Sequence, residues 1–259
     1  MSLQRLKDIV ARLRDPETGC PWDQKQNFKS IAVYTLEEAY EAVDAINRED
    51  YAELKDELGD LLLQVVFHAQ IANELGYFDL SGVENAICEK MLRRHPHVFG
   101  PAKDRTYDED RVKLSWEKEK ARERAEKERH GVLDGIPLAF PALKRAQKLQ
   151  KRAATVGFDW QQAKAVLDKV KEEVAELEQA IGNRNDMAIS EETGDLLFSC
   201  VNLARHLGVD AETALMSANN KFEKRFRLLE SILAARQRRP HDCSLEEMDE
   251  LWDQVKQNV

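Results

Sequence analysis

Residues 172–195 read EEVAELEQAIGNRNDMAISEETGD, an acidic segment whose pattern occurs twice in the chain. It begins with three carboxylates, Glu172, Glu173 and Glu176, and ends with two more, Glu192 and Asp195. Residues 37–60 read EEAYEAVDAINREDYAELKDELGD, so each of these acidic positions recurs 135 residues earlier. A duplicated pattern of constant spacing indicates two related structural units in one chain.

Each copy has the periodicity of two helices joined by a short polar turn. In the second copy, apolar residues predict helices over 166–181 and 189–207, with GNRND at 182–186 as the turn. In the first copy, the helices are expected over 35–46 and 51–75, with NRED at 47–50 between them. The 51–75 helix is apolar over so wide an arc that several neighbouring helices, or a second subunit, should bury it.

The whole chain of 259 residues is rich in charged and aliphatic residues, with only 11 glycines and 7 prolines. This composition predicts an all-α protein, a tandem repeat of α-helical bundle units. We expect a first unit over 1–107, a charged helical linker over 108–136, and a second unit over 137–259. Further helices are predicted over 3–14, from about 81, and over 143–155, 210–236 and 244–255, with a loop over 15–23.

Charge and cysteine usage exclude several function classes. The net charge is −9, and residues 1–100 carry 11 Lys and Arg against 18 Asp and Glu, so stable nucleic-acid binding is not expected. No apolar run is long enough to cross a membrane. Four scattered cysteines without CxxC spacing indicate a reduced, cytoplasmic protein without structural zinc.

The repeated carboxylates favour a metal site over a solvated acidic face. On a helix, Glu172, Glu173 and Glu176 lie within about 100° of arc, and the later pair lies within about 60°. Like charges at these spacings repel one another, and a hard divalent cation removes the repulsion. An all-oxygen ligand set suits Mg²⁺, with Mn²⁺ as a substitute, and the absence of Glu-x-x-His motifs disfavours a di-iron site.

Magnesium held by few carboxylates usually takes phosphate oxygens as further ligands, and cations are available to bind phosphate. Lys221 and Arg225 lie four residues apart on one helical face, although ordinary surface cations would give the same pattern. Trp252 could stack on a base, but core packing is the commoner role of a tryptophan. His68 lies on the same helical stripe as Glu57 and Asp60, but a lone histidine at such a position more often has a structural role than a catalytic one.

Several motifs together resemble the MazG family of nucleoside triphosphate pyrophosphohydrolases. They are LRDPETGCPWD, TLEEAYE, ELGDLLLQVVFHA, RRHPHVFG, QKRAATVGFDW, EETGDLLFSCVNLARHLG and NKFEKRF, and they cover essentially the whole chain. The resemblance implies a homodimer of tandem α-helical units that hydrolyses nucleoside triphosphates to monophosphates and diphosphate. It also implies Mg²⁺ dependence, broad base tolerance and a housecleaning role against non-standard nucleotides.

Carried over by residue, the resemblance implies a site in the second unit. Its metal ligands would be Glu173, Glu176, Glu192 and Asp195. Its catalytic carboxylates would be Glu172 and Glu173. Its nucleotide contacts would be Lys169, Glu172, Glu173, Lys221, Arg225 and Trp252. The matching metal set in the first unit is Glu38, Glu41, Glu57 and Asp60. Tyr34 replaces Lys169 there, so we expect the second unit to be the principal catalytic one.

Two alternatives stay open at this point. One is a non-catalytic helical module that binds nucleotide or metal for regulation. The other is an enzyme of narrow specificity for dUTP or phosphoribosyl-ATP.

Overall fold

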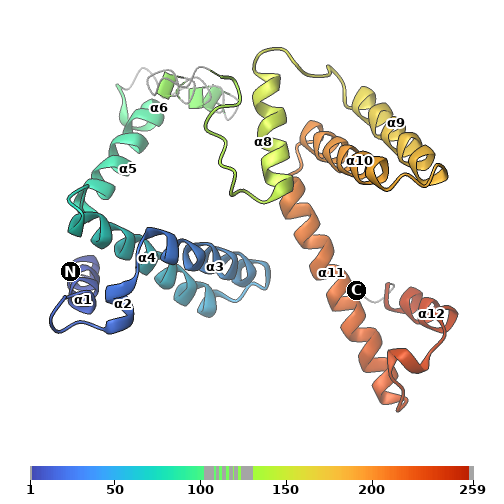
Figure 1. The fold of residues 1–259 in the computed structure, drawn as a ribbon, viewed down its shortest axis with the longest axis horizontal. Coiled ribbons are helices and arrows are strands. Elements are labelled where there is room, and N and C mark those ends of the chain that lie inside the picture. Colours follow the sequence, from blue (N-terminus) through green and yellow to red (C-terminus); the bar gives the residue numbers. More distant parts are fainter. Residues whose placement is uncertain are drawn as a thin grey trace. The chain divides into compact units, whose positions relative to one another are not determined.

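The computed structural model describes residues 2–101, 108, 111–112, 115–116, 119, 122–123 and 131–256. Within these residues every regular element is a helix, which confirms the predicted all-α fold (Figure 1). The chain divides into two units, residues 1–122 and 123–259. No helix in the described part is long and apolar enough to span a membrane.

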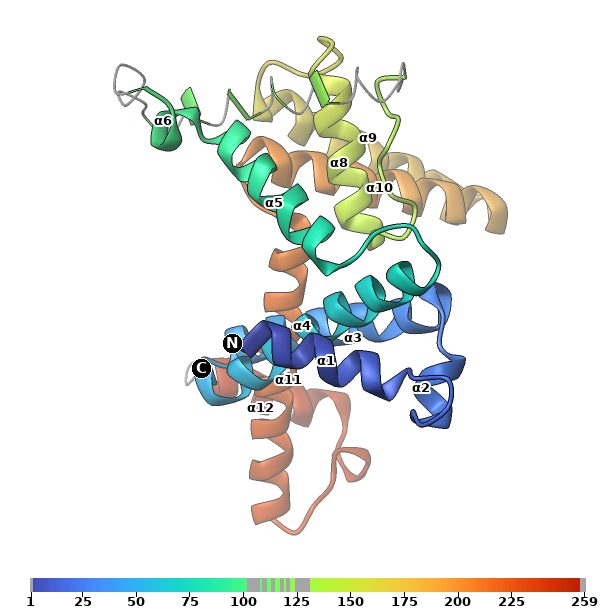
Figure 2. The ribbon, with the colours of Figure 1, turned by 90° about the vertical axis from the view of Figure 1, so that its left-hand side faces the viewer.

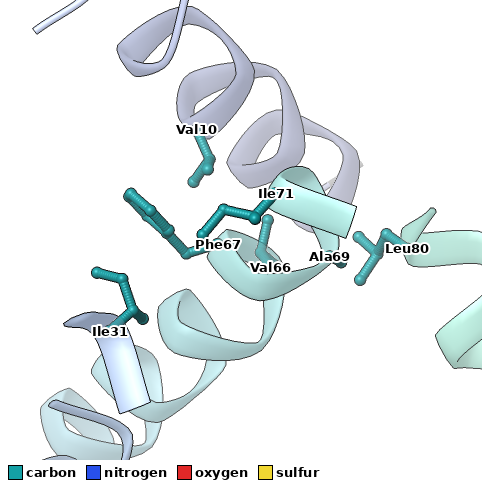
Figure 3. Packing of buried hydrophobic residues seen from close by; sticks show 7 residues of the cluster. All are labelled: Val10, Ile31, Val66, Phe67, Ala69, Ile71 and Leu80. Carbon is teal, nitrogen blue, oxygen red and sulfur yellow. The ribbon is translucent and has the colours of Figure 1, made fainter. Parts of the chain in front are cut away.

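The first unit is built on a long helical hairpin. Its helices are α1 (Ser2–Leu13), α2 (Pro21–Lys25), α3 (Phe28–Asn47), α4 (Tyr51–Glu74), α5 (Leu80–Arg94) and α6 (Pro96–Phe99). Helices α3 and α4 pack along each other, and α1 and α5 pack against α4. Figure 3 shows the core where these helices meet, with Val10 from α1, Ile31 from α3, Leu80 from α5 and four residues of α4.

The second unit repeats the hairpin. Its helices are α8 (Ala142–Ala154), α9 (Ala163–Gly182), α10 (Asp186–His206), α11 (Ala211–Ala235) and α12 (Leu245–Lys256), with a 3-10 turn at Pro240–Asp242. Helices α9 and α10 pack along each other, and α8 packs against α10. In both views α12 lies along the C-terminal half of α11, away from the α8 and α10 end of that helix (Figures 1 and 2).

Both hairpin turns have the same backbone design. Glu49 and Arg184, 135 residues apart, adopt left-handed conformations with φ of 57° and 53°. The next residue caps the second helix in each case: the side chain of Asp50 accepts from Glu53 N, and that of Asn185 accepts from Ala188 N. The repeat seen in the sequence is therefore a repeat of local structure as well.

Two sequence expectations in the first unit are wrong at their boundaries. Helix α3 begins at Phe28, not Thr35, because Asn27 and Ser30 form a reciprocal capping box that starts the helix two turns earlier. Residues 21–23, predicted as loop, begin the short helix α2, because Pro21 is accommodated at its first turn without losing a hydrogen bond.

The wide apolar arc of α4 is buried over only part of its length. Val66, Phe67 and Ile71 are core residues, whereas Leu58 and Leu62 near the start of the helix are exposed. The facing helix α3 exposes Val33 to 65%. A two-helix hairpin cannot cover both of its own apolar faces, so the chain alone leaves this part of the bundle incomplete.

Much of the expected linker, 108–136, lies outside the described residues. Of the described ones, 108 and 131–136 are not helical, whereas 111–112, 115–116, 119 and 122–123 are. They are not simply solvated: Trp116 Nε1 donates to Arg94 O at 2.9 Å, and Arg93 pairs with Glu119 at 2.8 Å. This segment is therefore tied to the end of α5.

The hairpin cap can be tested by Asn185→Ala. Removing the acceptor for Ala188 N should lower the free energy of unfolding by about 1 kcal/mol, as measured by urea denaturation. Asn183→Ala, two residues away on the same turn, is the matched control and should have a much smaller effect. Equal effects of the two substitutions would show that the cap does not stabilise the turn.

Candidate functional site

Helices α9 and α10 bring three carboxylates of the second unit together. One oxygen each from Glu173, Glu192 and Asp195 lies within 4.8 Å of the others. Glu176, one turn after Glu173, is close enough to contribute to the raised pKa of Glu192. The antiparallel hairpin thus brings two sequence groupings, separated by a turn, into one cluster of three carboxylates with Glu176 beside it.

Glu173 and Lys169 are the best-defined pair of this cluster. Glu173 is only 5% exposed, and its Oε1 lies 2.9 Å from Lys169 Nζ. The same ammonium donates to Glu172 Oε1 at 2.7 Å, and the two carboxylates raise the pKa of Lys169 above its ordinary range. The side chain of Glu172 stays accessible, with 58% of its surface exposed.

The remaining carboxylates are not neutralised in this way. Burial, together with repulsion from Glu176, Asp195 and Glu173, raises the pKa of Glu192. Raised pKa values signal that the charged form is disfavoured where it stands. A divalent cation bound by these oxygens would reverse that penalty, so the residues fit a hard metal ion.

The first unit has the corresponding cluster, with different support. Oxygens of Glu38, Glu41 and Glu57 lie within 4.8 Å of one another, and Asp60 is near enough to help raise the pKa of Glu38, after the larger effect of burial. Gln64 Nε2 lies 3.5 Å from Glu38 Oε1, which is a weak hydrogen bond.

In the first unit, Tyr34 stands at the position of Lys169 and makes an aromatic contact. Tyr34 lies edge-on to Trp22, with ring centroids 6.0 Å apart. His68 has structural partners, since its Nε2 lies 3.0 Å from Thr35 Oγ1 and its ring stacks on Phe28. Neither tyrosine nor histidine supplies the ammonium that the second cluster has.

The other predicted nucleotide contacts lie on a different helix pair. Lys221 and Arg225 are on α11, and Trp252 is on α12, where its ring packs against Phe222 with centroids 5.2 Å apart. Helix α12 lies away from the α8 and α10 end of α11 (Figures 1 and 2). Within one chain, the hairpin and the α11–α12 pair therefore form separate groups, and the nucleotide role of these three residues stays a prediction.

Comparison with known proteins gives a family match that covers both hairpins. A family model described as the MazG nucleotide pyrophosphohydrolase domain matches residues 26–99 and 161–227. The two segments contain both carboxylate clusters. The chain belongs to the MazG family.

Similarity to individual MazG relatives extends over nearly the whole chain. A nucleoside triphosphate pyrophosphohydrolase of Escherichia coli is 54% identical over 98% of this chain and 97% of its own length. The nucleoside triphosphate pyrophosphohydrolase/pyrophosphatase MazG of Thermotoga maritima is 42% identical over 98% of this chain and 95% of its own. An uncharacterized Bacillus subtilis protein, YabN, is 42% identical over 97% of this chain and 51% of its own length.

The raised pKa of Glu192 gives a stability test. A carboxyl group whose pKa is raised by folding destabilises the metal-free folded protein above that pKa, and the penalty disappears as pH falls through it. Glu192→Gln should therefore raise the Tm of the metal-free protein at pH 7, with a gain that shrinks on acidification. Calorimetry in EDTA across a pH series measures both effects.

An exposed residue on α9 supplies the control for this test. Glu178→Gln removes the same charge at a position that does not contribute to the raised pKa of Glu192, so it should change Tm much less. Added Mg²⁺ should stabilise the wild type more than Glu192→Gln. Identical Tm values for wild type and Glu192→Gln at pH 7 would show that the cluster is not under electrostatic strain.

Proposed function

We propose that this MazG-family chain is a Mg²⁺-dependent nucleoside triphosphate pyrophosphohydrolase whose principal site lies on α9 and α10. The observation that supports the proposal most directly is the buried Glu173, clustered with Glu192 and Asp195 and paired with Lys169. The names of the Escherichia coli and Thermotoga maritima relatives support the reaction class. Broad base tolerance, a housecleaning role and a cytoplasmic location stay predictions.

The metal ligands would be Glu173, Glu176, Glu192 and Asp195. Mg²⁺, or Mn²⁺ in its place, would neutralise charge on the phosphate oxygens and lower the pKa of a bound water. The donor set is made only of carboxylate oxygens, which is the chemistry that Mg²⁺ prefers. The first unit's Glu38, Glu41, Glu57 and Asp60 are a second candidate set without a lysine counterion.

The hydrolysis that we propose breaks the bond between the α-phosphorus and the oxygen that bridges to the β-phosphorus. The oxygen of a water forms the new bond to the α-phosphorus, and diphosphate leaves. Glu172 is placed to take the proton of that water, because it is accessible and shares Lys169 with the buried ligand Glu173. Lys169 orients both carboxylates and contributes a positive charge where the triphosphate arrives.

The substitutions Glu172→Gln and Glu173→Gln separate the role of Glu172 as proton acceptor from that of Glu173 as metal ligand. Loss of a proton acceptor should lower kcat by about 100-fold or more for Glu172→Gln, with metal affinity nearly unchanged. Glu173→Gln should weaken metal binding as well as turnover. Steady-state kinetics and calorimetric titration of Mn²⁺ measure the two effects, and equal loss of metal affinity in both variants would contradict the assignment of Glu172.

The reaction itself is tested by product analysis. Incubation with ATP and Mg²⁺ should release AMP and diphosphate, whereas ADP and single phosphate would overturn the pyrophosphohydrolase assignment. Glu176→Ala should abolish most turnover and Glu41→Ala should retain it, because we assign the principal site to the second unit. A panel of nucleotides run on the same samples distinguishes broad tolerance from specificity for dUTP or phosphoribosyl-ATP.

We further propose that a second copy of the chain completes the site. The hairpins expose apolar side chains that one chain does not cover, including Val33, Leu36 and Ile46 on α3 and Leu197 on α10. A homodimer that pairs these faces would bury them in larger helical bundles. It could also bring Lys221 and Arg225 of one copy to the carboxylates of the other.

Mixing two inactive variants tests the shared site. If Arg225 acts in the partner's site, Glu176→Ala chains mixed equally with Arg225→Ala chains should recover about a quarter of wild-type turnover after subunit exchange. The expected value follows from statistical pairing, since each heterodimer then contains one intact site. Complete inactivity of exchanged heterodimers would place Arg225 and the carboxylates of a working site on the same chain.

A further inference from the structure

A cavity of about 260 Å³ lies between α8, the loop at 157–160 and α10. Its walls are mainly apolar and include the aromatic rings of Phe158, Trp160 and Phe198. Pockets for drug-sized ligands begin at roughly 300 Å³, so this cavity suits a single small ring system. The predicted nucleotide contacts do not include any of these three residues.

The loop that carries two of the aromatic rings is anchored to α10. Gly157 ends the preceding turn with φ of 85°, a conformation that glycine adopts readily. Asp159 then accepts from Arg205 Nη1 at 3.0 Å and lies 2.9 Å from His206 Nε2. Arg205 also donates through Nε to Asn202 Oδ1 at 3.0 Å. These bonds hold the cavity wall in place before any ligand arrives.

Gln150 is one of the four polar residues that line the cavity, with Asp159, Asn202 and Arg205. It lines the cavity, is only 7% exposed, and donates through Nε2 to Phe198 O at 2.8 Å, which fixes the orientation of its amide. Its Oε1 is buried and has no hydrogen-bond partner among the described residues. A buried acceptor without a donor costs about 1–3 kcal/mol, so a ligand that donates a hydrogen bond here would recover that cost.

The cavity lies on the carboxylate side of α10. Asp195 and Asn202 are seven residues apart, which places them on one helical face about 10 Å apart along the axis. Ser199, between them, is buried on that same face. The cavity and the metal-ligand cluster therefore lie along one face of α10.

We propose that this cavity binds a nucleobase, with its ring against the aromatic side chains and an N–H group donating to Gln150 Oε1. A flat apolar ring with donors at its edge matches both the aromatic walls and the buried acceptor, and stacking of a base on an aromatic ring contributes about 1–3 kcal/mol. The choice of a nucleobase rests on the proposed function. The base belongs either to the triphosphate being hydrolysed or to a separate nucleoside, and it does not require stacking on Trp252.

Binding can be measured without turnover. Adenosine, guanosine, cytidine and uridine would each be titrated into the full-length protein in EDTA, with tryptophan fluorescence and calorimetry as readouts. At least one nucleoside should quench the fluorescence, and the quench should disappear in Trp160→Phe and persist in Trp22→Phe. No quench and no binding heat with any of the four would overturn the proposal.

The role of Gln150 has a matched control on the same helix. Gln150→Leu should weaken nucleoside binding by about ten-fold or more, because it removes the acceptor. Gln147→Leu removes an amide that donates to Val209 O at 3.0 Å and does not line the cavity, and it should bind normally. Circular dichroism verifies that both variants are folded, and equal affinities of the two variants would contradict the proposed contact.

Inhibition kinetics identify the source of the base. If the cavity holds the base of the triphosphate, the nucleoside should inhibit hydrolysis competitively and Gln150→Leu should raise KM. If a separate nucleoside binds there, inhibition should be non-competitive and KM unchanged. Nucleoside binding in a protein that releases no diphosphate would refute the proposed function and leave the cavity assignment standing.

Discussion

The repulsion among carboxylates on the α9–α10 hairpin is the constraint on which the rest of this site depends. Three acidic side chains from two helices, Glu173, Glu192 and Asp195, lie together, and of these only Glu173 has an ammonium partner among the described residues. Hydrophobic contact between the helices must hold the hairpin together against that repulsion. The same balance applies to α3 and α4, where no lysine corresponds to Lys169.

The hairpin was predictable because its information is local. Carboxylates at spacings of three and four, a polar turn and a capping residue are all visible within 24 consecutive residues. The two copies reinforced each other, and the structure gives both turns a left-handed residue followed by a capping Asp or Asn. The errors lay at helix boundaries. Helix α3 begins at Phe28 because a reciprocal cap between Asn27 and Ser30 outweighs the weaker apolar periodicity there.

The cavity beneath the 157–160 loop could not be predicted from the sequence. Gln150 and Phe198 are 48 residues apart and Asp159 and Arg205 are 46 apart, and only folding brings each pair together. The motif GFDW was visible, but its aromatic residues alone are compatible with ordinary core packing. Burial of an amide oxygen without a donor is a property of three-dimensional packing, so no sequence pattern reveals it. Similarly, the separation of Trp252 from the α9–α10 hairpin depends on the direction of α11.

Lys169 also gives the second cluster a positive charge that can change partners. Its ammonium contacts both Glu172 and Glu173, so in the metal-free protein it acts as an internal counterion. If a divalent cation bound Glu173, as we propose, Lys169 would be released from part of that task while remaining at the edge of the cluster. Its positive charge would then be available to an incoming anion, whereas the first unit, with Tyr34 at this position, has no equivalent charge to offer.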